Sequence, residues 1–276
     1  QPPSSTLFPY TAPFRSQLWF EAAGSGAILA QRENALQIAR QWLHQGKILA
    51  VKGLGGFHLV CDATNPQAVA NLRNRKKRSD KPFALMAFDL DTIEQHALLC
   101  QAERNLLTSN SSPIVLLTRH PASSIAEQVA PHQTSLGFML PYTPLHLLLL
   151  EPESGYPNAW VMTSANRSEE PIAYEDADAR QRLGNLADGY LFHNRPIHMR
   201  VDDSVVRTVH QAAYPLRRAR GYAPESIHLH RSLPAILATG AELKNTFCLT
   251  HQQHAFLSHH IGDLENYETL GAFEAG

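Results

Sequence analysis

A dense group of basic residues is the first feature of this chain that could do chemistry. Against a single acid, Asp80, six cationic side chains fall within nine positions: Arg73, Arg75, Lys76, Lys77, Arg78 and Lys81. Recognition of phosphate needs several donors aimed at one point, and arginine supplies a two-pronged contact. The alternative is a solvated helix end, where basic side chains suit the helix dipole equally well. Composition alone does not separate the two.

A short polar motif follows an apolar run. Thr163-Ser164-Ala165-Asn166 closes the run 160–163, which we expect to be a strand. Ligands of open α/β sheets bind beyond the carboxyl ends of strands. Ser164 and Asn166 could therefore hold phosphate or carbonyl oxygens, although an ordinary turn before a helix is the alternative.

A third group mixes acids with arginines. Asp202 and Asp203 are adjacent, and around them lie Arg195, Arg200, Arg207, Arg217, Arg218 and Arg220. Two adjacent acids could coordinate Mg²⁺ through water. They could equally pair with the arginines in a salt-bridged rim of a sheet, which we favour for most of these side chains. The arginines just before Gly221-Tyr222 could reach one anion.

The glycine-rich segment Lys52–His58 predicts a tight turn after a strand. Its sequence, Lys-Gly-Leu-Gly-Gly-Phe-His, fits neither the phosphate loop nor GxGxxG, but its glycines allow close approach of the backbone to another group. His58 is either a general acid or base or, as we favour, a packed and hydrogen-bonded histidine. The 15 histidines show no strong metal-ligand spacing, so we expect no metal site.

The elements around these residues alternate between helix and strand up to about residue 195. Periodicity and capping residues predict helices at 33–45, 65–75 and 92–107, and strands at 48–52, 83–88, 114–118 and 160–163. Strands predominate later, with three short ones expected at 235–239, 246–250 and 255–259. This order predicts an α/β fold (α+β in stricter usage), a twisted mixed sheet with helices on both faces.

Composition limits the class of protein. The 276 residues carry a net charge of −1, so no global field attracts nucleic acid or anionic membranes. The longest apolar run, Leu145–Leu150, is far shorter than the ~18 residues of a spanning helix. The three cysteines are Cys61, Cys100 and Cys248, a sparse and odd count that fits the reducing cytosol. We expect a cytoplasmic protein that does not enter membranes.

Several motifs together resemble a known family. Lys52–Ala63 and Arg75–Pro82 look like the nucleotide-binding core of YrdC-like domains. The resemblance narrows to the HypF family of nickel–iron hydrogenase maturation carbamoyltransferases through Met162–Asn166, His193–Arg195, Asp202–Val205 and Arg217–Pro224. It extends through Gly240–Cys248 and His260–Asn266.

The resemblance implies a reaction sequence. In this family an acylphosphatase domain cleaves carbamoyl phosphate to carbamate, and the YrdC-like domain joins carbamate to ATP, giving carbamoyl adenylate and pyrophosphate. A transferase domain then passes the carbamoyl group to the C-terminal Cys of the partner HypE, for synthesis of the cyanide ligands. ATP and Mg²⁺ are the implied cofactors. Zinc belongs only to an N-terminal part of the family's full chain.

The resemblance also implies roles for individual residues. Lys76 and Arg78 match the family's Lys-x-Arg pair and would be catalytic; with Lys81 they would neutralise the triphosphate, because fixed cations stabilise the charge on departing pyrophosphate. The other nucleotide-binding residues carried over are Ser164, Asn166, Arg200, Asp203, Ser204 and Arg218.

We expect three parts in the chain. Residues 1–16 hold four Pro and no Cys, where the family has zinc-finger cysteines, so we expect a disordered or foreign segment. Residues 17–232 would form the YrdC-like nucleotide-binding domain. Residues 233–276 would be the truncated start of an actin-like ATPase-fold transferase domain. On this interpretation the chain is a fragment that cannot complete the reaction alone.

Two alternatives stay open. A threonylcarbamoyl-adenylate synthase of tRNA modification uses the same core with threonine and bicarbonate, but the motifs from Arg217 onward argue against it. A YrdC-like RNA-binding module would use residues 73–81 as its footprint. The neutral net charge and the lack of aromatic residues within that cluster argue against RNA.

Overall fold

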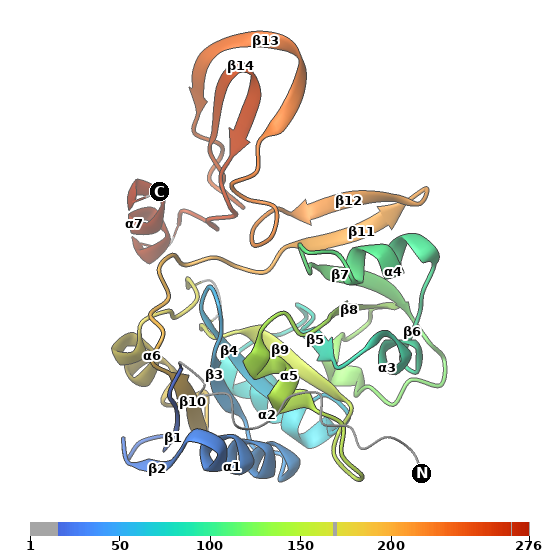
Figure 1. The fold of residues 1–276 in the computed structure, drawn as a ribbon, viewed down its shortest axis with the longest axis vertical. Helices are drawn as coiled ribbons and strands as arrows, with labels where there is room; N and C mark the ends of the chain where they lie inside the picture. Colours follow the sequence, from blue (N-terminus) through green and yellow to red (C-terminus); the bar gives the residue numbers. More distant parts are fainter. Residues whose placement is uncertain (1–15, 168–169, 266, 276) are drawn as a thin grey trace.

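A mixed sheet organises the chain. The computed structural model describes residues 16–167, 170–265 and 267–275, so the segment predicted at 1–16 lies, except for Ser16, outside the described residues. Within them, 12 strands join in one sheet in the order β12-β11-β7-β8-β5-β9-β4-β3-β10-β1-β2, with β6 paired to β7 (Figure 1). Three pairs are parallel (β10 with β3, β5 with β8, β7 with β11), and the others are antiparallel. The predicted mixed sheet is confirmed.

The strands of this sheet are short. They are β1 (Leu18–Ala22), β2 (Ile28–Gln31), β3 (Leu49–Lys52), β4 (Phe57–Asp62), β5 (Ala84–Ala87), β6 (Ala97–Leu98), β7 (Ile114–Arg119), β8 (Ser135–Met139), β9 (Ala159–Ser164), β10 (Gly189–His193), β11 (Val205–Val209) and β12 (Ala212–Arg217).

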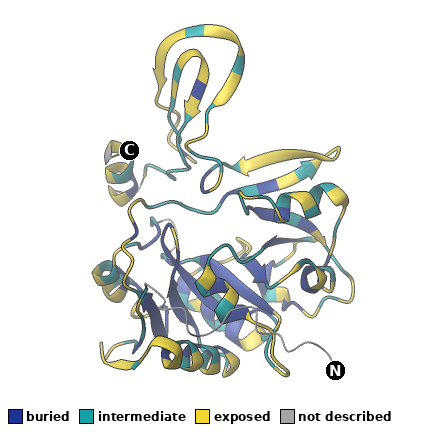
Figure 2. Cartoon of the chain, viewed as in Figure 1, coloured by how far each residue is buried: buried dark blue, intermediate teal, exposed yellow. Residues whose placement is uncertain are grey.

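Helices cover both faces of the sheet, as predicted. They are α1 (Arg32–His44), α2 (Pro66–Lys76), α3 (Leu90–Glu94), α4 (Gln101–Leu107), α5 (Pro144–Leu150), α6 (Asp176–Leu183) and α7 (Tyr267–Ala275), with a 3₁₀ turn at Glu127–Val129. One apolar core contains buried residues of α1 and α5, and the other contains those of α2 and α6. The central strands between them are buried on both sides (Figure 2).

Local signals explain the limits of α2. The Asn65 side chain accepts hydrogen bonds from the backbone N–H groups of Gln67 and Ala68, and Pro66 occupies the first turn, both strong helix-starting features. At the other end Lys77 adopts a left-handed conformation, with φ of 50°. The helix therefore stops directly after Lys76, which places that side chain at its carboxyl end.

Two predicted segments differ from the structure. The helix expected over 92–107 is two helices, α3 and α4, with the short strand β6 between them. β6 forms because residues 97–98 pair with β7, a tertiary contact that overrides the apolar pattern of the segment.

The second difference lies near the C-terminus. The three strands expected at 235–239, 246–250 and 255–259 are two long ones, β13 (Ile227–Ala238) and β14 (Cys248–Leu257). Residues 251–254, expected to form a turn, continue β14 and pair with β13, as His254 does with His228. The boundary predicted between residues 232 and 233 falls within β13, and the division into domains stays a prediction.

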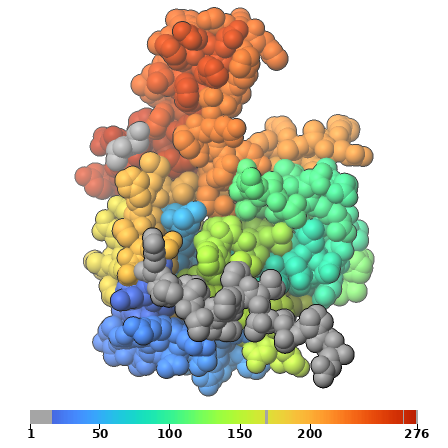
Figure 3. Space-filling view, in the orientation of Figure 1, coloured from blue at the N-terminus to red at the C-terminus, as the bar shows by residue number. Residues whose placement is uncertain are grey.

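The β13–β14 hairpin projects from the body of the molecule (Figures 1 and 3). It forms a separate two-stranded sheet, and most of its side chains are exposed. In the described part of the chain, no helix is long and apolar enough to cross a bilayer.

Candidate functional site

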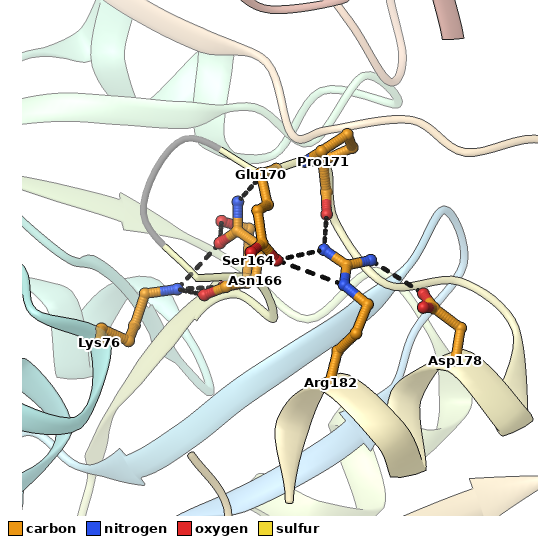
Figure 4. Close-up of polar contacts among 7 residues, drawn as sticks. All are labelled: Lys76, Ser164, Asn166, Glu170, Pro171, Asp178 and Arg182. Atoms are coloured by element: carbon orange, nitrogen blue, oxygen red, sulfur yellow. Dashed lines mark hydrogen bonds and ion pairs between the residues drawn. The ribbon is translucent and has the colours of Figure 1, made fainter. Parts of the chain in front are cut away.

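Lys76 is a buried cation at the centre of the site. Its side chain is 2% exposed. Its Nζ donates hydrogen bonds to the carbonyl oxygens of Ser164 and Asn166, both at 2.7 Å, and to Oδ1 of Asn166 at 2.9 Å (Figure 4). Burial first, and then the charges of Arg78 and Lys81, lower the pKa of Lys76 well below its usual value. An anion placed beside this amine would favour its charged form.

The turn that Lys76 holds is fixed from the other side by α6. Ser164 Oγ donates to Asn166 Oδ1 at 3.0 Å, and Asn166 Nδ2 donates to the Glu170 carbonyl at 2.5 Å. The Glu170 carboxylate in turn accepts from Arg182 on α6, at 3.0 Å (Figure 4). Three of the predicted nucleotide-binding residues, Lys76, Ser164 and Asn166, thus lie together in one hydrogen-bond network.

Arg78 shapes the loop that follows α2. It donates from Nε to the Lys81 carbonyl at 2.8 Å and from Nη2 to the Pro82 carbonyl at 2.5 Å. The guanidinium groups of Arg73 and Arg78 both lie over the Phe83 ring, at 4.7 and 4.9 Å from its centre. Burial and the neighbouring Arg73 charge lower the pKa of Arg78 to about 10.

Not all of the basic cluster faces this site. Arg73 donates to the backbone carbonyls of Gln128 and Ser79, so it braces the loop. Arg75 pairs with Asp188 at 2.9 Å. These two residues have structural partners, which reduces the cluster's capacity to act as one continuous basic surface.

Further charges converge on Lys76 from the segment after residue 199. Arg217 shifts the pKa values of Arg78 and Lys81 downward, and Asp202 opposes that shift at Lys81 and at Lys76. Burial is the largest cause of the lowered Lys81 pKa. Arg217 lies 3.9 Å from the Asp202 carboxylate. Arg217 therefore acts on Arg78 and Lys81, and Asp202 acts on Lys76 and Lys81.

A cleft opens beside these charges. Its lining includes Arg200 and Asp202, the adjacent His259 and His260, and Ala272 of α7. Burial lowers the pKa of both histidines and of Arg200. The predicted residue Arg200 thus faces a cleft to which the C-terminal segment contributes.

Asp203 and Ser204 have a different environment from the one predicted. Asp203 is held by His58 and Arg220, at 3.1 and 2.8 Å. Ser204 is fully buried; its Oγ donates to the Arg220 carbonyl and accepts from the Ala219 N–H. Both side chains are engaged by protein groups, an arrangement that suits a positioning role; their contact with a nucleotide stays a prediction.

Arg218 also serves a connecting role. It donates to the carbonyls of Leu257, Tyr222 and Glu225. The His260 N–H donates to the Arg218 carbonyl at 2.9 Å. Arg218 therefore links the end of β12 to the segment before β13 and to the end of β14.

The described residues show no site in which protein side chains alone would hold Mg²⁺. Asp203 is used by His58 and Arg220, which leaves Asp202 of the adjacent acids. Within the ranges that the structure describes, no three His, Cys, Asp or Glu side chains gather as metal ligands. Magnesium commonly binds through few protein carboxylates together with substrate phosphates, so any Mg²⁺ here would come with a nucleotide.

Sequence reasoning left Arg217, Asp202 and His260 out of the selected site residues. Arg217 and Asp202 belonged to a recognised motif, but the choice among adjacent arginines and acids depended on which side each faces. The sequence signal for His260 is weaker. The pair His259-His260 suggests only a metal site, and His260 lies 184 residues beyond Lys76 in the chain.

Comparison with known proteins shows the family of the chain. The Sua5/YciO/YrdC family model, described as "Telomere recombination", matches residues 41–219. The model described as "HypF Kae1-like domain" matches residues 231–276. Carbamoyltransferase HypF2 of Cupriavidus necator is 47% identical over 245 residues, which cover 83% of this chain and 30% of that protein. The chain belongs to the YrdC-like family, in its HypF group. Carbamoyltransferase HypF of Synechocystis is 45% identical over 250 residues, which cover 90% of this chain and 32% of that protein.

Solved structures of HypF proteins have the same fold. A full-length HypF in the phosphate- and nucleotide-bound form gives a TM-score of 0.86 at 41% identity, over 94% of this chain and 33% of that one. The structure of T.kodakarensis HypF gives a TM-score of 0.88 at 35% identity, over 94% of this chain and 34% of that one. The Sua5 of P. abyssi shares the fold alone. Its TM-score is 0.60 at 17% identity, over 68% of this chain and 54% of that one. The chain spans about a third of the length of the HypF relatives it matches.

Proposed function

We propose that this YrdC-like region binds ATP and joins carbamate to its α-phosphate, as one step of a carbamoyl transfer. A carbamate oxygen would attack the α-phosphorus, and the bond from that phosphorus to the oxygen bridging the β-phosphate would break. The bridging oxygen leaves with pyrophosphate and takes the bonding electron pair. The carbamate anion has no proton to lose in this step, so the proposal needs no general base.

The observation that carries this proposal is the buried Lys76 ammonium in contact with the Ser164–Asn166 turn, with Arg78 and Lys81 beside it. Negative charge develops on departing pyrophosphate, and fixed cations in a partly dehydrated site stabilise it without reorganisation. Arg217 adds a further positive charge near Arg78 and Lys81, and the carboxylate of Asp202 reduces the net positive charge around Lys76 and Lys81. The related full-length HypF, solved in its phosphate- and nucleotide-bound form, supports the same ligand class.

The wider reaction belongs to this proposal as well. The relatives named carbamoyltransferases are about three times as long as this chain, and their additional length would supply carbamate from carbamoyl phosphate. Transfer to HypE and a cytoplasmic location are part of the proposal.

Threonine is the competing acceptor of the adenylate step. Purified chain with ATP and Mg²⁺ should release pyrophosphate when ammonium bicarbonate supplies carbamate. Threonine with sodium bicarbonate serves as the parallel reaction. We expect release with the first mixture at least tenfold above the second, and the reverse ratio would move the chain to the tRNA-modification group.

RNA binding is less well supported by the geometry. Arg73 and Arg75 are occupied by backbone and carboxylate partners, and a basic face needs exposed cations. A titration with single-stranded RNA between 50 and 200 mM salt measures this directly. We expect weak binding, and an affinity that falls a thousandfold over this range would favour the RNA module instead.

A further inference from the structure

A bridge of two side chains, His58 and Asp203, connects the central sheet to the segment 200–203. His58 lies on β4 as the register partner of Ser164 on β9. Its Nε2 donates to Asp203 Oδ2 at 3.1 Å, because an ionised carboxylate is an acceptor only. His58 is 3% exposed. The bridge thus begins on the sheet beside the Lys76 network and ends on the segment that carries Arg200 and Asp202.

The other end of the bridge is equally well held. Arg220 Nε donates to Asp203 Oδ1 at 2.8 Å, and the Arg220 guanidinium donates to the Ser112 carbonyl at 2.8 Å and lies 3.5 Å from the centre of the Tyr142 ring. Arg217 Nε donates to the Asp203 carbonyl at 2.8 Å. Burial of the Asp203 carboxyl opposes its ionisation, but the contacts with His58 and Arg220 outweigh this and hold the pKa of Asp203 below its usual range.

The segment also fits closely onto the glycine turn that precedes β4. The Val201 N–H donates to the Gly55 carbonyl at 3.0 Å. A Cβ atom added at Gly55 would lie 2.3 Å from Val201 Cγ1 and 2.4 Å from the Val201 oxygen. The glycine is needed here because the two backbones approach so closely that any side chain at position 55 would push residue 201 away.

We propose that His58 is a positioning residue of the nucleotide site: through Asp203 it fixes the segment 200–203, and with it Arg200 and Asp202, against the Lys76 network. This inference rests on the proposed nucleotide function. It assigns His58 no proton transfer. Truncation of His58 would release the segment and weaken nucleotide binding, while the chemistry at Lys76 would continue.

The surroundings of His58 allow a conservative rescue. Tyr142 Oη lies 3.5 Å from Nε2, and the His146 ring lies at 5.9 Å between centres. Among the described residues, Nδ1 of His58 has no hydrogen-bond partner. Only the Nε2 donor is therefore required, and the amide of glutamine can supply it in His58→Gln.

The test measures hydrogen exchange and ATP binding on the full chain. The variants are His58→Ala, His58→Gln and Asp203→Asn, with His96→Ala as the control. His96 is buried to a similar extent, at 2% exposure, and its Nε2 contacts Asn158 at 3.2 Å, on a different part of the sheet. Exchange at the Val201 amide reports on the segment without any ligand, and calorimetry with ATP reports on the site.

We expect His58→Ala and Asp203→Asn to speed exchange around Val201 at least tenfold and to raise the Kd for ATP at least fivefold. In the pyrophosphate assay KM should rise while kcat stays within twofold. His58→Gln should remain within twofold of wild type, and His96→Ala should change neither readout.

Unchanged exchange in both bridge variants would overturn the proposal, as would faster exchange with an unchanged Kd for ATP. If His58→Ala does not fold, the comparison of Asp203→Asn with wild type decides. A wild-type chain that binds no ATP would refute the proposed nucleotide function, and the exchange result would still show by itself whether the bridge holds the segment.

Discussion

Burial has opposite consequences for two residues near the site. Lys76 is buried against three oxygens, which compensate the loss of water around its amine. His146 is fully buried, and neither of its ring nitrogens has a hydrogen-bond partner among the described residues. The first arrangement prepares a charged group for a ligand, whereas the second penalises any charge on the ring.

His146 should make the protein less stable in acid. Burial, followed by the His58 charge, lowers its pKa from 6.5 to about 3. Between these values the unfolded chain binds a proton that the folded chain does not, so the free energy of unfolding falls as pH falls from 6.5 towards 3. The full effect is on the order of 5 kcal/mol, at 1.36 kcal/mol per pKa unit.

Denaturant unfolding at several pH values measures this effect in wild type and in His146→Leu. We expect the variant to lose less stability between pH 6.5 and 4, because leucine fills the site without binding a proton. The exposed His198 provides the control His198→Leu. Equal slopes for wild type and His146→Leu would show that His146 does not carry the acid sensitivity.

At the scale of elements, the N-terminal cap of α2 adds a contribution to stability that is separate from the packing of its buried face. The Asn65 side chain accepts from Gln67 N at 3.0 Å and Ala68 N at 3.1 Å. Asn65→Ala should lower the free energy of unfolding by about 1 kcal/mol, since such caps contribute about that amount. Urea unfolding checks this against Asn74→Ala, an exposed position of the same helix, which we expect to lose nothing. An equal loss in both variants would contradict a specific cap.

The close contact between the glycine turn and residue 201 gives a second prediction at this scale. Gly55→Ala should destabilise the fold by about 1–3 kcal/mol, as overpacking does, and should weaken ATP binding because the 200–203 segment must move. Gly271→Ala on α7 is the matched control, since nothing lies within 4 Å of an added Cβ there. Thermal unfolding and ATP calorimetry measure the pair. A Gly55→Ala protein as stable as Gly271→Ala would refute the close fit.

Local signals made α2 predictable, and tertiary contacts explain where prediction failed. Asn65, Pro66 and the apolar spacing sit within the helix itself. The β6 strand, in contrast, exists because residues 97–98 pair with Arg119 and Thr118, and nothing within 92–107 marks that pairing. The long β14 likewise depends on its partner β13 rather than on the sequence of residues 251–254.

The same distinction applies to the site. Lys76, Arg78, Ser164 and Asn166 were found because each belongs to a local motif, and the structure brings Lys76, Ser164 and Asn166 into one network. The contact of Asp203 with His58, which lies 145 residues away, was not predicted. Pairing across that distance is set by the sheet and leaves no signal in the local sequence.

For the whole molecule, the structure combines a buried sheet with an exposed hairpin. The β13–β14 pair is two-stranded and mostly exposed, and isolated two-stranded hairpins are marginally stable in water. Amide exchange should therefore be at least a hundredfold faster in β13 and β14 than in β3, β4 and β9, because local opening needs less free energy there. Mass spectrometry of the exchanged full chain checks this, and equal protection in both regions would contradict it.

The most direct test of the central claim is pyrophosphate release by matched lysine variants. Lys76→Met removes the buried ammonium at nearly constant volume, and Lys77→Met removes the exposed neighbouring charge. With ATP, Mg²⁺ and ammonium bicarbonate, we predict that Lys76→Met releases pyrophosphate at least a hundredfold more slowly than wild type, while Lys77→Met stays within threefold. If Lys76→Met is folded by circular dichroism and releases pyrophosphate at the wild-type rate, Lys76 does not form the adenylation site.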